Sequence, residues 1–179
     1  PGVSNTESWN GTSWFEVNDL NTGRYALAGT GTGNTSALAF GGETPDTGKT
    51  ESWNGSIWTE VGDLNTARAK LAGAGTNTSA LAFGGENGGS NATNTEEWNA
   101  NYAYGVWATG GSMNTARSAL AGCGTQTAAL GFGGYDTAET GATEAYNGTA
   151  WTELNNMNTV RNQLGGAGTQ TAALAFTGE

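Results

Sequence analysis

The sequence that decides the fold begins with Asn65-Thr66-Ala67-Arg68 and continues with Leu71-Ala72-Gly73-Ala74-Gly75-Thr76, Ala80-Leu81-Ala82-Phe83-Gly84-Gly85, Thr95-Glu96-Glu97-Trp98-Asn99 and Trp107. Four copies of this pattern follow one another along the 179 residues, with a period of 43 to 49 positions. Self-similarity at such a period is typical of repeat proteins, in which each repeat is one supersecondary unit. The chain is therefore predicted to be an array of four related units.

Four anchor positions mark the register of every copy. An Arg opens the unit, a Phe ends its second apolar segment, and two aromatic residues follow. In chain order the anchors are Arg24, Arg68, Arg117 and Arg161; Phe40, Phe83, Phe132 and Phe176; the first aromatic residues Trp9, Trp53, Trp98 and Tyr146; and the second aromatic residues Trp14, Trp58, Trp107 and Trp151.

Each unit predicts four short β-strands. In the second copy, residues 69–75 form a first strand of Ala, Leu and Gly, and residues 79–83 form a second strand that stops at a Gly-Gly pair. The third strand contains the first aromatic residue, and the fourth begins at the second one. Between them, Asn54-Gly55 predicts a hairpin with a type I′ turn, which needs positive φ at both central positions.

These motifs resemble the kelch repeat. The resemblance rests on Phe-Gly-Gly after the second strand, Glu-x-Trp-Asn in the third, a Trp five residues later, and Leu/Met-Asn-Thr-x-Arg before the next unit. The particular sequence of the repeats resembles that of kelch-type structural proteins of marine bacteriophages, especially those of cyanobacteria. The resemblance implies an all-β, four-bladed kelch-like β-propeller in which each blade is a four-stranded antiparallel sheet.

We expect one domain over residues 1–179, with units of about 21–64, 65–113, 114–157, and 158–179 joined with 1–20. Joining Glu179 to Pro1 would put ten positions between Phe176 and Glu7, against 11, 13 and 12 in the internal loops. The N-terminal strands are therefore predicted to complete the C-terminal blade and close the ring, because closure removes open strand edges. A monomer is expected, and a piece of a longer array or a two-chain, eight-bladed ring remain as alternatives.

Composition excludes several classes of function. The sequence has 16 acidic and 6 basic residues and a formal charge of −10, which argues against nucleic acid and anionic membranes as partners. No apolar run approaches the roughly 20 residues of a membrane span. There is one Cys and no His, so His-dependent hydrolases, His-ligated metals and the copper site of kelch-like galactose oxidases are excluded. Sialidases need an asymmetric Arg triad, which four equivalent Arg do not make. We expect no enzyme, no cofactor and no metal site.

The repeated residues have two interpretations each. The ring of Arg24, Arg68, Arg117 and Arg161 is either an anion-binding collar or, as we predict, a structural device. In the structural interpretation each Arg pairs with a repeat carboxylate such as Glu7, Glu51, Glu96 or Glu144, or with loop carbonyls. The paired aromatics Trp9, Trp14, Trp53, Trp58, Trp98, Trp107, Tyr146 and Trp151 either stack on sugars or pack blade against blade. Packing is predicted, because the sequence has few other large apolar residues.

Features that break the repeat are better candidates for binding. The third unit has a longer hairpin at 99–106, which carries Tyr102 and Tyr104, and the loops 43–49, 86–95 and 135–143 also differ. These three loops are predicted to share one face with the Arg turns, and they add Asn87, Asn91 and Tyr135 as candidate binding residues. Drift in solvated loops is the competing interpretation.

The resemblance implies an association with the virion, and hence a virion or extracellular location. Two functions fit it: a non-enzymatic module that adheres to host-surface glycan or protein through its variable loops, or a passive structural or decoration protein that binds other virion proteins.

Overall fold

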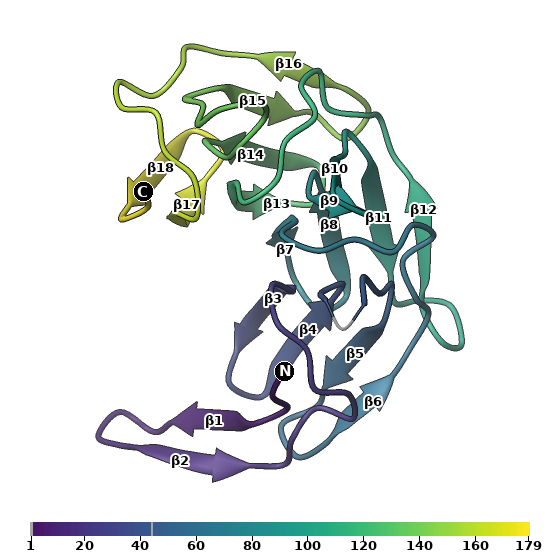
Figure 1. Cartoon of the computed structure of the whole chain (residues 1–179). Helices are drawn as coiled ribbons and strands as arrows, with labels where there is room; N and C mark the ends of the chain where they lie inside the picture. Colours follow the sequence, from purple (N-terminus) through teal and green to yellow (C-terminus); the bar gives the residue numbers. More distant parts are fainter. Residues whose placement is uncertain (1, 44) are drawn as a thin grey trace.

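The structure, a computed structural model, describes residues 2–43 and 45–179, and Pro1 and Thr44 lie outside the described residues. Within these ranges the chain consists of β-strands and loops and has no helix, so the predicted all-β class is confirmed. The described residues accordingly offer no helix of the length and apolarity that crossing a membrane requires. The strands form separate antiparallel sheets that succeed one another around an open arc (Figure 1).

Three of the sheets have four strands each, paired in chain order. Sheet I contains β3 (Ala28–Gly33), β4 (Ser36–Phe40), β5 (Thr50–Trp53) and β6 (Trp58–Glu60). Sheet II contains β7 (Ala72–Gly75), β8 (Ser79–Phe83), β11 (Thr95–Asn99) and β12 (Val106–Thr109). Sheet III contains β13 (Ala121–Thr125), β14 (Ala128–Phe132), β15 (Thr143–Tyr146) and β16 (Trp151–Glu153). A small hairpin of β9 (Glu86–Asn87) and β10 (Ser90–Asn91) lies in the loop between β8 and β11.

The two ends of the arc are two-stranded sheets. The N-terminal hairpin consists of β1 (Thr6–Trp9) and β2 (Trp14–Val17), and the C-terminal hairpin of β17 (Gly165–Thr169) and β18 (Ala172–Phe176). The predicted pairing of these hairpins within one chain is not formed in this structure, and Figure 1 shows them on either side of the open part of the arc.

Glycines on the inner strands set the spacing of the sheets. The first strands β3, β7, β13 and β17 lie along the inside of the arc, each in contact with the next. A Cβ added to Gly122 of β13 would lie 2.5 Å from Cζ of Phe83, and one added to Gly73 of β7 would lie 2.8 Å from Cζ of Phe40. Each Phe ring therefore rests directly on the glycine backbone of the next inner strand, where a side chain would not fit.

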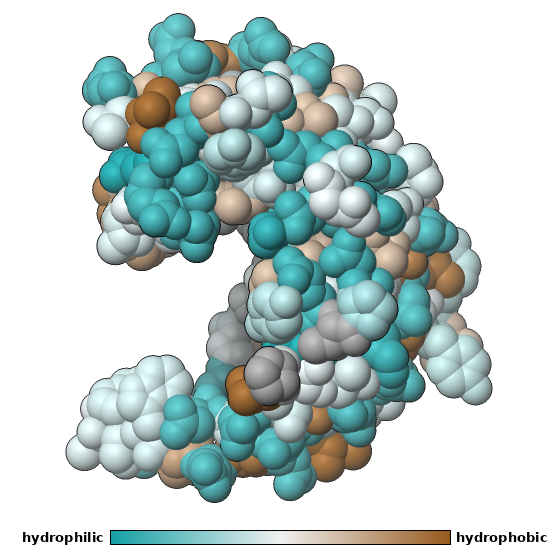
Figure 2. All heavy atoms as spheres, viewed as in Figure 1, coloured by the Kyte–Doolittle hydropathy of each residue, from teal (hydrophilic) through white to brown (hydrophobic). Residues whose placement is uncertain are grey.

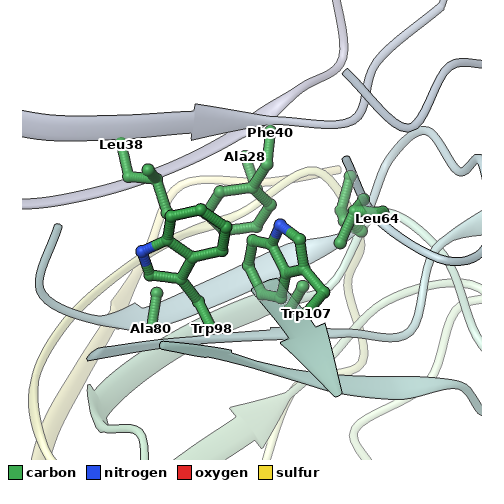
Figure 3. Packing of buried hydrophobic residues seen from close by; sticks show 9 residues of the cluster. Ala28, Leu38, Phe40, Leu64, Ala80, Trp98 and Trp107 are labelled. Carbon is green, nitrogen blue, oxygen red and sulfur yellow. The ribbon is translucent and has the colours of Figure 1, made fainter. Parts of the chain in front are cut away.

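The core consists of the contacts between neighbouring sheets. Phe40 of sheet I packs against Trp107 of sheet II, with ring centroids 5.0 Å apart, and Phe83 packs against Trp151 in the same way at 4.8 Å. Figure 3 shows the first of these interfaces, where Phe40 and Leu38 face the indoles of Trp98 and Trp107. The same aromatic contact repeated between sheets gives the arc a regular curvature.

The Asn-Gly turns differ from the prediction. Gly55 has a φ of +94°, but Asn54 is not among the residues with positive φ, so the turn is not type I′. Four residues separate the paired Trp53 and Trp58, and the side-chain oxygen of Asn54 accepts hydrogen bonds from the backbone N–H groups of Ser56 and Ile57. The Asn therefore caps a four-residue loop from its first position, and only the Gly needs the left-handed conformation.

Replacing Gly122 by Ala tests whether the Phe ring needs a bare backbone. We expect Gly122→Ala to lower the free energy of unfolding by about 2 kcal/mol, because the methyl group displaces the Phe83 ring. Gly33→Ala is the matched control, since an added Cβ there has no atom within 4 Å. Urea titration of both variants measures the difference, and equal stabilities would contradict this account of the sheet spacing.

Candidate functional site

One face of the arc gathers the Arg turns and the variable loops. Antiparallel bridges join Tyr25 to Glu43, Ala69 to Glu86, and Ser118 to Tyr135, and each bridge connects an Arg turn to the loop that follows a second strand. The prediction that these segments share one face is thus confirmed, although Thr44 of the 43–49 loop lies outside the described residues. We call this side of the molecule the loop face.

The centre of the loop face is a rim of four backbone segments in an uncommon conformation. The residue two positions after each repeat Arg has a positive φ of 51° to 54° although it is not Gly. In the last three units, the N–H of this residue donates a hydrogen bond to the carbonyl of the equivalent residue in the preceding unit, and each N···O distance is 2.8 Å. The rim residues are Ala26, Lys70, Ala119 and Gln163. Strained positions of this kind persist where the surrounding structure holds them, and they cluster at binding sites.

A cavity of about 700 Å³ opens at the rim. Its lining includes Lys70, Glu86 and Gln163, and two tyrosines that are about half exposed, Tyr25 and Tyr135. Nζ of Lys70 lies 2.7 Å from a carboxylate oxygen of Glu86 and 3.7 Å from one of Glu43. The hydrogen bond to Glu86 raises the pKa of Lys70, so the ammonium group stays protonated at and above neutral pH.

Tyr25 belongs to the same cluster. A hydrogen bond with the Glu43 carboxylate raises the pKa of the Tyr25 hydroxyl, which is therefore a neutral donor at physiological pH. An adjoining hollow of about 550 Å³ shares Tyr25 and Glu86 with the rim cavity and extends over Asn87 and Gly88. Figure 2 shows hydrophilic and intermediate residues around the hollowed side of the arc and no broad apolar patch on the visible face. The cluster thus offers donors, acceptors and aromatic rings side by side.

Asn87 and Asn91 hold the loops of this face in place. The Asn87 amide donates to the carbonyl of Ala67 at 2.7 Å, and the Asn91 amide donates to the carbonyls of Tyr135 and Asp136 at 3.0 and 2.8 Å. Asn91 therefore ties the loop of sheet II to that of sheet III, beside Tyr135. In this arrangement both amide groups hold the loops beside the site in place.

Tyr102 and Tyr104 lie elsewhere. They are exposed in the hairpin between β11 and β12, whereas Asn87 and Asn91 precede β11. The five residues of β11 separate these two loops by roughly 17 Å at the rise of an extended strand. The structure therefore divides the predicted binding residues between two opposite sides, and only Tyr135, Asn87 and Asn91 are brought together.

Sequence reasoning missed Tyr25, Lys70 and Gln163, whereas Glu86 opens the 86–95 loop that it named as a candidate. The available signal was a contrast within the repeat, since the position two residues after each Arg is Ala, Lys, Ala and Gln, while the next position is Leu in all four copies. A variable position beside a residue that is the same in every copy indicates that the fold fixes the backbone there but does not require a particular side chain. Its location on the rim could not be read from spacing, because it depends on how the units curve.

Three of the repeat Arg side chains are buried and paired with Glu. Arg24–Glu51, Arg68–Glu96 and Arg117–Glu144 have N···O distances of 2.7, 2.9 and 3.1 Å, and all six side chains are at most 2% exposed. Burial lowers the pKa values of Arg68 and Arg117 from their ordinary value. Each Glu also accepts the backbone N–H of the Asn that precedes the Arg by three positions, so it fixes the whole turn. Arg161 is half buried and donates to the carbonyls of Ala175 and Thr177.

Six of the eight paired aromatics are buried or half buried, away from the loop face. Trp53, Trp98, Trp107, Tyr146 and Trp151 are buried, and Trp58 is half buried. The indole N–H groups of Trp58, Trp107 and Trp151 donate to the hydroxyls of Thr6, Thr50 and Thr95 in the preceding sheet. Trp9 and Trp14, in the N-terminal hairpin, are exposed.

The loop face suits a ligand with many hydroxyl or amide groups and an apolar ring face. One ammonium between two carboxylates provides charge-assisted donors and acceptors, and the two tyrosines provide flat surfaces at the cavity wall. Among the described residues, no three His, Cys, Asp or Glu side chains come together in a way that could hold a metal ion.

Comparison with known proteins bears on the fold alone. No family model matches the sequence, and no curated protein matches it significantly. A solved structure reported as the structure of YjhT superposes with a TM-score of 0.81 over 99% of this chain and 69% of that chain, at 11% sequence identity. The all-β arrangement of several antiparallel sheets is therefore consistent with a β-propeller-like fold, and the neighbour extends beyond the arc that this chain forms.

Removing the partner of one buried Arg tests the structural role of these pairs. We expect Glu96→Gln to lower the free energy of unfolding by about 3 kcal/mol, because the Arg68 guanidinium is left buried without a counter-charge. Glu60→Gln is the matched control, since the Lys49–Glu60 pair has side chains 38% and 55% exposed and such pairs contribute about 0–1 kcal/mol. Denaturant unfolding measures both variants, and equal losses would contradict the assignment.

Tyr146 makes the free energy of unfolding depend on pH in the alkaline range. Burial and a 2.6 Å hydrogen bond to Glu97 raise the pKa of Tyr146 to about 12 from the ordinary value of 10.0. A raised folded-state pKa favours the protonated phenol, so this contribution is complete below pH 10 and is lost as the pH rises from 10 to 12. We expect Tyr146→Phe to lose less stability than the wild type between pH 9 and 12. The exposed Tyr104→Phe should leave the profile unchanged, and an identical profile for Tyr146→Phe would refute the assignment.

Proposed function

We propose that the chain is a non-enzymatic binding module that holds a hydroxyl-rich ligand, a surface glycan, on its loop face. The observation that carries this proposal is the rim cavity, where Tyr25, Lys70 and Glu86 meet Tyr135. Open cavities lined by exposed aromatic rings and a few convergent polar groups are default candidates for binding sites. The absence of His from the sequence and the pairing of the rim carboxylates with one ammonium favour binding over chemistry.

The resemblance to kelch-type bacteriophage proteins supports the setting that we propose for this binding. In that setting the chain is associated with a virion or is extracellular, and its ligand is a glycan or protein of the host surface. We also propose that the four sequence units correspond to four kelch-like blades, three as complete sheets and one shared between the two terminal hairpins. Residues 1–179 would then act as one domain.

A second candidate function is passive assembly, in which the chain is a structural or decoration protein that binds other virion subunits. The observation in its favour is the hairpin between β11 and β12, where Tyr102 and Tyr104 are 60% and 79% exposed on the side opposite the loop face. The two functions use different surfaces, because adhesion needs the loop face and assembly needs this hairpin.

Substitution of the rim tyrosines tests the adhesion proposal. We expect Tyr25→Ala and Tyr135→Ala each to weaken binding to an array of bacterial surface polysaccharides by about tenfold or more, since truncating a central aromatic contact removes at least about 1.4 kcal/mol. Tyr104→Ala is the matched control, because it removes an exposed Tyr from the opposite side. Glycan-array and titration measurements provide the comparison.

Two outcomes would count against the loop face. If Tyr104→Ala abolished binding while the rim variants retained it, the ligand would belong to the hairpin between β11 and β12. If the wild-type chain bound no surface polysaccharide but co-purified with particles, passive assembly would be the better function.

A further inference from the structure

The floor of the rim cavity is apolar and has the same residue type in every unit. The residue three positions after each repeat Arg is Leu. All four of these residues line the cavity: Leu27, Leu71, Leu120 and Leu164. The last three are buried, whereas the two tyrosines of the lining are about half exposed. The leucines therefore form the deep end of the cavity and the tyrosines its outer wall.

The Gly-Gly pairs hold this floor in one shape. A Cβ added to Gly84, in the preceding unit, would lie 2.9 Å from Cδ2 of Leu120, and one added to Gly134, in the same unit, would lie 2.9 Å from its Cβ. Leu71 makes the two equivalent contacts one unit earlier. Each Leu is therefore wedged between two glycine turns, and packing this close leaves the apolar floor preformed.

A buried hydroxyl group lies beside the floor. Ser118 lines the cavity and is 4% exposed, and its backbone N–H and C=O are both bonded to Tyr135. The hydroxyl itself has no hydrogen-bond partner within the part of the chain that the structure describes. Because buried polar groups are nearly always paired, an unpaired hydroxyl in a cavity wall is a group that a ligand can satisfy. The equivalent residue of the second unit is Ala69, so the fold itself does not need this hydroxyl.

The charged groups of the cavity disfavour an acidic ligand. Lys70 is the one cation among the described residues of the lining, and its ammonium group is already paired with Glu86 and Glu43. The adjoining hollow adds the carboxylate of Asp46. An acidic sugar would therefore meet more negative than positive charge. A free amine is disfavoured for another reason, since it would have to leave water to reach the leucine floor.

From these features we infer that the glycan held at the loop face is a neutral sugar with a methyl-ended substituent, either the methyl carbon of a deoxy sugar or the acetyl group of an acetylated one. The inference rests on the proposed function, because it names the ligand class of the same cavity. The methyl group contacts the floor at Leu71 and Leu120. The Ser118 hydroxyl donates to a ring or carbonyl oxygen beside that methyl group, and a rim tyrosine covers the face of the sugar ring.

An unsubstituted hexose fits the same cavity less well. Where a deoxy sugar has a methyl group, the hexose has a hydroxymethyl group, and its hydroxyl would be buried against leucine side chains without a partner. The cavity therefore selects its ligand by rejecting an unpaired polar group as well as by accepting an apolar one.

Titration with a matched series of sugars tests this inference. We expect oligosaccharides of a deoxy sugar or of an N-acetylated amino sugar to bind at least about tenfold more tightly than those of the hexose with the same ring configuration. Ser118→Ala should weaken this binding about fivefold, because a hydrogen bond to the ligand is lost. Ser56→Ala is the matched control, since Ser56 is exposed in the hairpin between β5 and β6.

The outcomes separate this inference from the proposed function. Comparable affinity for the unsubstituted hexose, or tighter binding of a uronate or a free amino sugar, would overturn the inference. The proposed function would stand in that case if Tyr25→Ala still weakened the binding. Unchanged affinity in Ser118→Ala would also overturn the inference, because the sugar would then not occupy the cavity beside this hydroxyl. If the chain bound neither a sugar of the series nor any polysaccharide, the proposed function would fail together with the inference.

Discussion

The contact of a phenylalanine ring with the glycine backbone of the next inner strand underlies the rest of the structure. It sets how closely successive sheets approach. The same Phe ring also packs against a Trp from an outer strand of the next sheet. Because the contact repeats, successive interfaces between sheets have closely similar geometry, as expected for a repeat protein whose units touch only their neighbours. The spacing of the sheets along the arc and the rim that they form depend on it.

The buried Arg–Glu pairs fix the direction in which the chain leaves the core toward the loop face. Each Glu binds the guanidinium and the backbone of the Arg turn, so the turn leaves the core in one fixed direction. Two positions later the chain passes through a left-handed residue and bonds to the preceding unit. The side chains of the rim are thus placed by rigid backbone while their identities are free to vary, which suits a binding site on a repeat scaffold.

The sequence predicted more of the scaffold than of the site. The strands, their antiparallel order and the shared loop face were predictable because glycines, aromatics and turn residues each have local requirements that recur in register. The Asn-Gly hairpins were predicted in place but not in type, since the loop length between the paired Trp residues decided the turn. Tyr25, Lys70 and Gln163 were not predicted, because they meet only where units far apart in sequence curve toward one axis.

The sequence by itself determined that this chain is an all-β array of four units, because the spacing of Arg, Phe and Trp repeats and each unit needs the next to bury its aromatics. Only the tertiary structure decided the curvature of the array, and with it the rim cavity and the separation of Tyr102 and Tyr104 from Tyr135. The angle between sheets results from many close contacts acting together, and it cannot be deduced from the pattern of residues along the chain.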